Sequence, residues 1–526
     1  MNFELKSIIE EYRAGSDFKA SLGGKGLYEQ SKINERFYIG DQWYGAKCGN
    51  DRPLVRHNVI KRIGSYKMSQ ILNSPITVRY SAEGVPSEEL TDEFTFSGEN
   101  ADNKEVNYIM SAFDNYYKTT SERLKLFDLN ERILRKAYIS GTSVLYTYWD
   151  SSVNTGLFAD RDKKVKIKGD ICSEVLDIED IVFGDPYCEL LQNQPFIIIR
   201  SFKDIDNVLR QARLNGASLE RLDLIKNAAQ KGKIEIFTKL YKEYKAGGSY
   251  TIKSVTVCEK TVIRDSFETG LTLYPLAIFS WERKNNLIYG ESEITYLIPN
   301  QIAINRMITA NVWAGMTSGM PIMVVNGDTV NDKITNEPGQ IIKVYGSNED
   351  VSGAVKYVSP QTFSEQFDKS INSLIDNTLT QSGANEVALG DSQATNASAL
   401  SLMRDAALVP LQIIRNRFYT FSEDVARIWA DFWINYYGQR NFKLMGKDGV
   451  KYIPFDSERY KDLVITARVD IANSYSYTEK ERNEMLLTLF EKGIINKRQF
   501  LSRLPEGAVA DIKSLIKESE EENERL

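Results

Sequence analysis

The sequence predicts an α+β protein that is mainly helical and consists of several domains. The chain has 526 residues, and a single hydrophobic core stops growing at roughly 250 to 300 residues. Apolar residues recur at helical spacing over long stretches, most clearly in 103–140, 291–318 and 363–382. From Thr142 to Trp281 the period falls to two, which is typical of strands. Helical regions therefore flank a strand-rich region.

The first 140 residues are predicted to be mostly helical. Three helices are expected there, near residues 2–13, 26–40 and 59–73. A polar stretch follows, and a long amphipathic pattern then begins near Asn103 and continues to Ser140. Gly141 should end this pattern, because glycine commonly follows the C-terminus of a helix.

The strand-rich region contains six runs in which apolar residues alternate with polar ones. These runs are 142–149, 163–178, 196–202, 232–244, 249–259 and 273–281. One helix, near residues 205–230, is expected to interrupt them.

The next 150 residues follow an order of helix, insert, helix, loop and long helix. The first helix is expected over 291–318, and the second, over 363–382, ends at Ser382-Gly383. The insert between them holds three short strand-like runs and a turn at Asn326-Gly327-Asp328, which suggests a small α/β or β module. A polar loop, 384–396, precedes a helix of about 40 residues that Pro410 should kink.

The last part of the chain combines a buried helix, strands and short helices. Eight apolar residues form a stripe on the long helix that is predicted to be core: Phe418, Phe421, Val425, Ile428, Trp429, Phe432, Trp433 and Tyr436. A strand-like unit is expected near 451–471. A helix over 478–492 should follow, with Thr478 and Glu481 as a capping box and Gly493 at its end. Two further helices are predicted near 496–504 and 508–518.

Composition and charge exclude several classes of protein. The net charge is −6, which argues against a protein that binds nucleic acid through its whole surface. Residues 291–400 hold twelve acidic and five basic residues, which gives this segment a net charge of −7. The rest of the chain therefore has a net charge of about +1. No apolar run approaches the roughly 20 residues of a membrane helix, and secretion is not expected either, because the N-terminus is charged from its fourth residue. Four cysteines without CxxC spacing (Cys48, Cys172, Cys188 and Cys258) predict neither a zinc site nor disulfides and fit a reducing cytoplasm.

The chain carries no recognisable catalytic motif. It has no phosphate-binding GxxxxGK[ST] loop, and its only histidine, His57, is expected to be a partly exposed structural residue. Asp177, Glu179, Asp180 and Asp185 lie within nine residues and leave a Mg²⁺ site open, although the last two resemble turn residues. No cofactor and no enzymatic activity are therefore predicted.

Several segments resemble portal proteins of tailed bacteriophages, in particular those common in long-tailed phages of Gram-positive bacteria. At the N-terminus these are residues 37–43 (FYIGDQW), 52–63 (RPLVRHNVIKRI) and 73–78 (NSPITV). The resemblance continues through residues 289–294 (YGESEI), 381–391 (QSGANEVALGD) and Ser398-Ala399-Leu400, and it covers essentially the whole chain. Pro299, inside the first of the two bracketing helices, departs from the pattern and leaves the start of that helix open.

The resemblance implies a multidomain portal fold that assembles into a ring, usually a dodecamer, at one vertex of the capsid. Double-stranded DNA would pass through the ring without sequence specificity during packaging and ejection. The implied division is a wing (1–290 and 398–477), two stem helices (291–318 and 363–383), a clip (319–362), a tunnel loop (384–397) and a crown with an acidic tail (478–526). The implied partners are further copies of the chain, the terminase large subunit, a head-completion or adaptor protein that connects head and tail, and the major capsid and scaffold proteins. The implied location is the virion, after assembly in the host cytoplasm.

The resemblance also assigns roles to three sets of residues. The tunnel loop would contribute Asn385, Glu386, Asp391, Ser392, Gln393, Thr395 and Asn396. Because a closed ring requires a second apolar face on the stem, contacts between subunits are expected at Ile308, Val312, Trp313, Met316, Phe367, Ile371 and Leu374. Partner docking on the clip is expected at Asn326, Asp328, Lys333, Lys343 and Tyr345.

The acidic bias of 291–400 leads to a hypothesis about movement of DNA. An electronegative channel gains no phosphate contacts, so DNA should slide through it, and replacing Glu386 and Asp391 by lysine should slow packaging. Two alternatives remain open. One is a DNA-processing phage enzyme, a metal-dependent nuclease acting through the Asp177 cluster. The other is a different capsid-associated structural protein.

Overall fold

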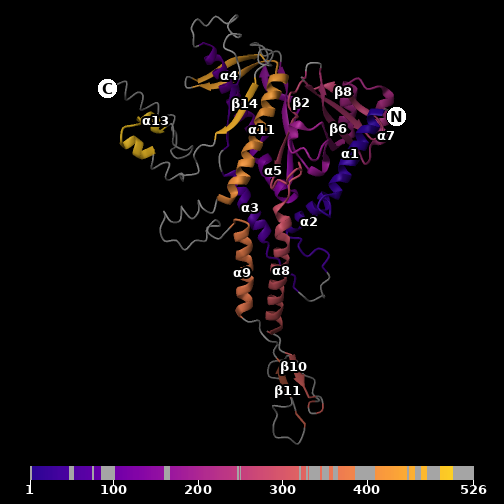
Figure 1. Ribbon diagram of the computed structural model, residues 1–526, viewed down its shortest axis with the longest axis vertical. Helices are drawn as coiled ribbons and strands as arrows, with labels where there is room; N and C mark the ends of the chain where they lie inside the picture. The colour runs from indigo at the N-terminus through magenta and orange to yellow at the C-terminus, as the bar shows by residue number, and fades with distance from the viewer. Residues whose placement is uncertain are drawn as a thin grey trace. The chain divides into compact units, whose positions relative to one another are not determined.

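The computed structural model of the protein describes residues 3–46, 53–73, 76–83, 101–158, 166–245, 248, 250–318, 322–326, 328, 330, 344–345, 355–358, 365–384, 409–446, 449–456, 464–470 and 486–501. The chain divides into two compact units, one formed by Met1–Asn73 and Val78–Arg468 and the other by Ser74–Thr77 and Val469–Leu526. Helices and antiparallel sheets alternate along the first unit (Figure 1). A multidomain chain of mixed helix and strand is thus confirmed.

A five-stranded antiparallel sheet lies at the centre of the strand-rich region. Its order is β4 (Ile181–Phe183), β5 (Phe196–Asp204), β6 (Lys233–Tyr244), β7 (Tyr250–Cys258) and β8 (Val262–Glu268). The start of β5 is apolar at successive positions because both faces of the strand are covered. Ile197 and Ile199 belong to one hydrophobic cluster and Ile198 to the cluster on the opposite face.

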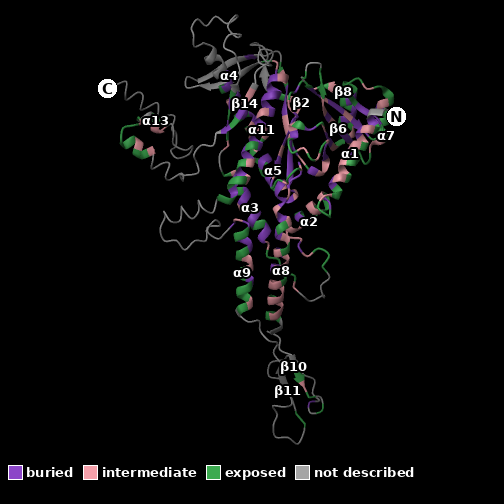
Figure 2. Cartoon of the chain, viewed as in Figure 1, coloured by how far each residue is buried: buried purple, intermediate pink, exposed green. Residues whose placement is uncertain are grey.

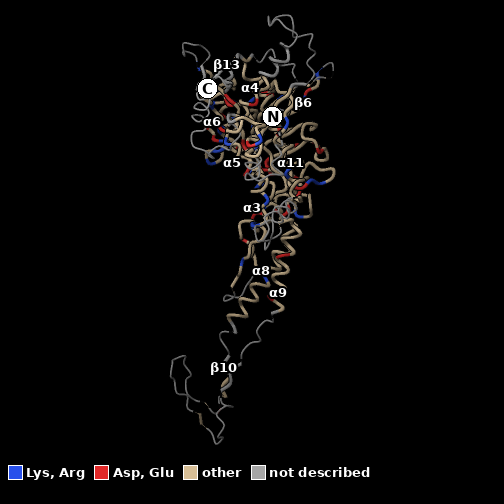
Figure 3. The backbone as a smooth tube through the Cα atoms, turned by 90° about the vertical axis from the view of Figure 1, so that its left-hand side faces the viewer, with Lys and Arg blue, Asp and Glu red and all other residues tan. Residues whose placement is uncertain are grey.

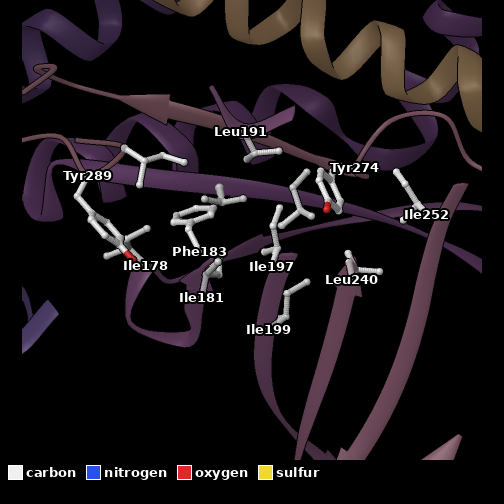
Figure 4. Packing of buried hydrophobic residues seen from close by; sticks show 13 residues of the cluster. Ile178, Ile181, Phe183, Leu191, Ile197, Ile199, Leu240, Ile252, Tyr274 and Tyr289 are labelled. Carbon is white, nitrogen blue, oxygen red and sulfur yellow. The ribbon is translucent and has the colours of Figure 1, made fainter. Parts of the chain in front are cut away.

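Helices and a second sheet cover this central sheet. α1 (Phe3–Ser21) packs on one face through Leu5, Ile8 and Tyr12. On the other face, Val144 and Leu276 come from a three-stranded sheet with the order β3 (Lys166–Leu176), β2 (Thr142–Phe158) and β9 (Leu276–Ser280). Figure 4 shows the side chains of this cluster gathered between the strands. α6 (Ile205–Leu214) and α7 (Leu219–Ala228) pack on Ile234 and Ile236 of β6.

Three further helices pack together beside these sheets. α2 (Leu27–Ile39) and α3 (Val59–Leu72) both contact α5 (Leu126–Ser140). Gly64 allows the close approach of α3 to α5, because a Cβ at this position would lie 2.4 Å from the ring of Tyr138. The Tyr138 hydroxyl donates to the carbonyl of Ile60 on α3 (3.1 Å). Gly141 ends α5 with φ at 88°, as predicted.

An aromatic cluster joins α11 (Gln412–Tyr436) to α4 (Ala101–Leu124) and β1 (Thr77–Glu83). The ring of Trp433 lies 5.5 Å from that of Phe113, 5.5 Å from that of Tyr116 and 5.9 Å from that of Tyr80. The predicted core stripe is confirmed, since seven of its eight residues are buried and Tyr436 is half-buried (Figure 2).

The remaining described strands form three two-stranded sheets. β12 (Gln439–Gly446) pairs with β13 (Gly449–Asp456), and β14 (Val464–Asp470) pairs with β1. In the predicted insert, β10 (Ile322–Val325) pairs with β11 (Val355–Val358) in antiparallel register, with Ile322 opposite Val358. These two strands follow α8 (Glu293–Ser318) and precede α9 (Glu365–Gln381) along the chain.

The second unit is described mainly over 486–501. A helix there ends at Gly493, where the N–H of Ile494 donates to the carbonyl of Leu489 (3.0 Å) and that of Gly493 to Phe490 (3.0 Å). This pair of bonds is a Schellman motif, and the predicted stop at Gly493 is confirmed. The short helix α13 (Lys497–Leu501) follows. Thr478, Glu481 and the helix predicted over 508–518 lie outside the described residues.

Several boundaries differ from the prediction. α1 continues to Ser21 instead of ending near residue 13. The helix expected over 103–140 is two helices, because Lys125 adopts a left-handed conformation (φ 52°) between α4 and α5. The helix expected over 205–230 is also two, α6 and α7, and the short strand β4 and the strand β8 were not predicted. At Pro410 the chain forms a 3₁₀ turn (Val409–Leu411) from which α11 starts, and residues 398–408 of the predicted long helix lie outside the described chain.

Candidate functional site: the helix pair α8 and α9

The helices α8 and α9 run side by side in opposite directions (Figure 1). Asn300 Nδ2 of α8 donates to Thr378 Oγ1 of α9 (3.3 Å), and Asn311 Nδ2 donates to Asp368 Oδ1 (2.5 Å). The two donors are eleven residues apart on α8 and the two acceptors ten residues apart on α9. Because either spacing corresponds to about 15 Å of helix, the helices remain paired over that length.

One face of α9 is apolar and the other is polar. Ile371 and Leu379 are buried, while Phe367, Leu374 and Ile375 are half-buried. Of the residues predicted as subunit contacts on α9, Ile371 is thus covered within its own chain, with 6% of its surface exposed. The exposed positions of α9 are mostly small or uncharged: Ser370, Asn372, Ser373, Asn377, Thr380 and Gln381. Figure 2 shows this exposed side of α9 in green.

α8 keeps apolar side chains in contact with solvent. Val312 is 39% exposed and Met316, one turn further on, is 51% exposed. Ile308 and Trp313 are half-buried. Together, Val312 and Met316 form an exposed apolar edge near the C-terminal end of α8; towards its start, Tyr296 is exposed as well (57%). The resemblance had placed subunit contacts at these positions.

A row of polar side chains fixes α8 to the segment that precedes α3. Gln301, Asn305 and Thr309 follow one another at a spacing of four and so lie on one side of the helix. The backbone N–H of Val55 donates to Thr309 Oγ1 (3.2 Å), and that of His57 donates to Asn305 Oδ1 (3.0 Å). Gln301 Nε2 donates to the carbonyl of His57 (2.6 Å). The backbone of His57 is held in this way, while its side chain is exposed.

The same row completes the N-terminus of α3. The first N–H groups of a helix lack partners inside the helix. Gln301 Oε1 accepts from the N–H groups of Val59 (3.0 Å) and Ile60 (3.3 Å), and Asn58 Oδ1 accepts from Lys61 (3.0 Å). A side chain from α8 therefore supplies part of the cap of α3, and the two helices stabilise each other.

A buried ion pair fixes the start of α8. Lys67 Nζ of α3 lies 2.6 Å from Glu293 Oε1, and the two side chains are only 7% and 15% exposed. Trp281 Nε1 donates to the other carboxylate oxygen of Glu293 (3.0 Å). α8 begins at Glu293 and includes Pro299, so the helix start that Pro299 left open lies six residues before the proline.

The two helices carry little of the negative charge of their segment. α8 contains only Glu293 and Arg306 as charged residues, a net of zero, and α9 has three acidic residues and one basic residue, a net of −2. The segment 291–400 has a net charge of −7, so −5 belongs to residues outside α8 and α9. Figure 3 accordingly shows both helices mostly without charged residues. The acidic bias lies mainly in the insert and the loop.

The tunnel-loop and clip residues are described only in part. Asn385, Glu386, Asp391, Ser392, Gln393, Thr395, Asn396, Lys333 and Lys343 lie outside the described residues. Asn326 and Asp328 are exposed, as is Tyr345. The N–H of Asp328 donates to Asn326 Oδ1 (3.1 Å), which confirms the predicted turn at this point.

The acidic cluster at Asp177 is engaged by basic side chains. Asp177 pairs with Lys136, and Arg200 donates to Asp180 Oδ1 through Nε (2.8 Å) and Nη2 (2.6 Å). Asp185 Oδ1 accepts from the N–H of Tyr187 (3.0 Å), as expected of a turn residue. Within the described residues, no three His, Cys, Asp or Glu side chains are close enough together to hold a metal ion. The geometry gives the nuclease alternative no support.

Glu179, in the same cluster, should make stability depend on pH. Burial, and then the charges of Asp177 and Asp180, raise its pKa to about 7, against the opposing effect of Lys32 and Lys19. In the unfolded chain a glutamate titrates near pH 4.3. Between about pH 4.3 and 7 the folded state therefore binds more protons than the unfolded state. The contribution of Glu179 to the free energy of unfolding is therefore fully present below about pH 4, and it is lost as the pH rises through about 7.

Glu179→Gln removes this titration. We expect the difference in urea midpoint between about pH 5 and pH 8 to become smaller in this variant. Glu220→Gln, at an exposed position on α7, is the control for loss of one carboxylate. Identical pH profiles for wild type and Glu179→Gln would contradict the prediction.

Two features of the helix pair were missed in the sequence. The row Gln301, Asn305 and Thr309 was visible as polar residues spaced by four in an otherwise apolar helix. The ion pair of Lys67 and Glu293 gave no such signal, because its members are 226 residues apart.

The comparisons with family models and with curated sequences identify no relative of the chain: no family model matches it, and no curated protein has a matching sequence.

As to membranes, the described helices include none that combines the length and the apolar character of a bilayer-spanning segment.

Proposed function

We propose that the chain is the subunit of a ring-shaped portal through which double-stranded DNA enters and leaves a phage capsid. The observation that carries this proposal is the exposed apolar edge of Val312 and Met316 on α8. It remains after α8 has packed against α9 and has been fixed to the α/β part of the chain. A second copy of the chain would remove this edge from water.

Contacts of this kind close a ring when they join unlike surfaces head to tail. The edge on α8 is apolar, whereas the exposed side of α9 is polar, so the helix pair presents two different surfaces. A contact of either surface with a different surface of the next subunit is heterologous and repeats around an axis. α8 has 26 residues, which gives a wall about 39 Å long.

The composition of α9 suits a surface along which DNA moves. Its exposed side chains are mainly hydroxyls and amides, with no cluster of lysine or arginine in the described helix. Each cation in contact with a phosphate releases counterions and adds affinity. A surface of mainly uncharged polar groups, with a net charge of −2 on the helix, avoids this gain and leaves the duplex free to slide.

The other parts of the portal assignment are proposals on the same basis. The strands β10 and β11 would form the core of a clip that docks the terminase large subunit and later a head-completion protein. Residues 384–397 would form the tunnel loop, and the C-terminal unit would face the capsid interior.

Electron microscopy of the purified protein tests the proposal directly. We expect rings with a central hole, and we expect the double variant Val312→Glu, Met316→Glu to lose them because two carboxylates would enter an apolar contact in each interface. Both positions are exposed in the single chain, so the variant should fold normally by circular dichroism.

Leu214 and Leu219 provide a matched control. They are 81% and 80% exposed and lie in α6 and α7. The double variant Leu214→Glu, Leu219→Glu makes the same chemical change away from α8 and should keep the rings. A wild-type protein that is monomeric at every concentration, or that forms particles without a hole, would refute the portal proposal. A capsid-associated protein of another kind would then be the better assignment.

A further inference from the structure

A strongly basic stretch surrounds the start of α3. Residues 52–82 contain six Lys or Arg residues and no Asp or Glu, in a chain with a net charge of −6. Lys67 is used in the buried ion pair with Glu293. Arg56, Lys61 and Arg62, by contrast, are exposed.

Arg306 of α8 joins this group in space. Val55 and His57, the neighbours of Arg56, donate to Thr309 and Asn305 of α8. Arg306 directly follows Asn305 and is exposed. Arg56 and Arg306 therefore project from two backbone segments that are joined by hydrogen bonds.

Lys61 and Arg62 lie in the first turn of α3, which Gln301 of α8 caps. We name Arg56, Lys61, Arg62 and Arg306 the basic patch. Among the described residues, none of the four forms an ion pair within the chain. Elsewhere in the same unit, cations such as Lys239, Arg200 and Arg221 are paired with carboxylates.

We propose that the basic patch binds the phosphate backbone of double-stranded DNA. This inference rests on the proposed function, which supplies DNA as the polyanion that each subunit meets. Three of the four residues are arginines, whose planar guanidinium groups bind phosphate oxygens in pairs. Contacts to phosphate oxygens carry no sequence information, so the proposed contact is independent of sequence.

The basic patch and α9 would have different roles in contact with DNA. The exposed side of α9, mainly hydroxyls and amides with a net charge of −2 on the helix, would leave the duplex free to move. The four cations of each subunit would provide an electrostatic contact that holds the duplex weakly, and the strength of this contact falls as salt rises.

The test compares two variants in which four cations are replaced by glutamine. The patch variant carries Arg56→Gln, Lys61→Gln, Arg62→Gln and Arg306→Gln. The control variant carries Arg210→Gln, Arg213→Gln, Lys231→Gln and Lys233→Gln, all at exposed positions near α6 and α7. All eight side chains are exposed, so thermal melting should confirm that both variants fold.

Binding of a short fluorescent DNA duplex to the assembled protein is measured by anisotropy over a series of salt concentrations. Each lost phosphate contact lowers the slope of log K against log salt by about 0.9. We expect the patch variant to bind at least about tenfold more weakly than wild type at low salt, with a smaller slope. The control variant should behave like wild type.

Equal affinity and equal slope in wild type and patch variant would overturn the inference. So would full competition by poly-glutamate at the same concentration of charge, because the patch would then fit an acidic polypeptide. If the patch variant still forms rings but binds DNA like wild type, the inference fails while the proposed function stands. If the wild type forms no rings and the patch variant alone loses DNA binding, the proposed function fails while the patch stands.

Discussion

Replacing Trp433 by alanine is expected to lower the free energy of unfolding of the first unit by about 3 to 5 kcal/mol. Trp433 is fully buried, and its ring contacts those of Phe113 and Tyr116 on α4 and Tyr80 on β1. Its loss leaves a large cavity at the point where three elements meet, and a rigid interior closes such a cavity only in part.

Trp433→Phe separates packing from hydrogen bonding. The indole N–H of Trp433 has no hydrogen-bond partner in the described structure, so phenylalanine loses volume and no hydrogen bond. We expect a clearly smaller effect than for alanine. Urea unfolding followed by near-ultraviolet circular dichroism, which reports on packed aromatic rings, measures both variants. Equal destabilisation by alanine and phenylalanine would show that ring packing is not the source of the stability.

The sequence predicted the elements whose pattern depends on their own residues. The stripe that contains Phe418 and Trp433 indicated a buried helix because the spacing of its apolar residues can be read without knowing the partner. The same holds for β5, where residues 196–202 indicated a strand, while the cover on both of its faces is a finding of the structure.

Breaks in helices were harder to predict because the apolar spacing continues across them. Lys125 separates α4 from α5 by a left-handed backbone conformation, and lysine has no special preference for it. The pattern of Leu124, Phe127 and Leu129 runs through the break and favours a single helix. Between α6 and α7, Asn215-Gly216 is a turn signal in the sequence, and α6 ends at Leu214 directly before it.

The candidate site could be predicted as two helices but not as an anchored pair. The lengths of α8 and α9 follow from periodicity and from the stop at Gly383. The cap that Gln301 places on α3 joins residues more than 240 positions apart, and helical spacing carries no information about such partners. The basic stretch in 52–82 can be recognised in the sequence as a run without acidic residues. That Arg306 lies next to this stretch is shown only by the structure.

Replacing Lys67 by methionine is expected to cost about 3 to 5 kcal/mol of the free energy of unfolding. The change leaves the carboxylate of Glu293 buried, with the N–H of Trp281 as its remaining hydrogen-bond donor among the described contacts. An uncompensated charge in a medium of low polarity is more costly than a missing methylene group. Because Glu293 is the first residue of α8, the variant should also weaken the attachment of the helix pair and reduce the number of rings in electron micrographs.

The double variant Lys67→Met, Glu293→Leu distinguishes the cost of an unpaired charge from the loss of a useful interaction. Replacing both partners of a buried ion pair by apolar residues is often neutral or stabilising, so the double variant should recover most of the stability that Lys67→Met loses. Lys226→Met on the exposed pair of Lys226 and Asp223, whose side chains are 52% and 71% exposed, is the control and should change stability by less than about 1 kcal/mol. Urea midpoints of the four proteins measure these differences. If the double variant is as unstable as Lys67→Met, the pair contributes through its own attraction, and the start of α8 depends on this salt bridge rather than on the apolar packing around it.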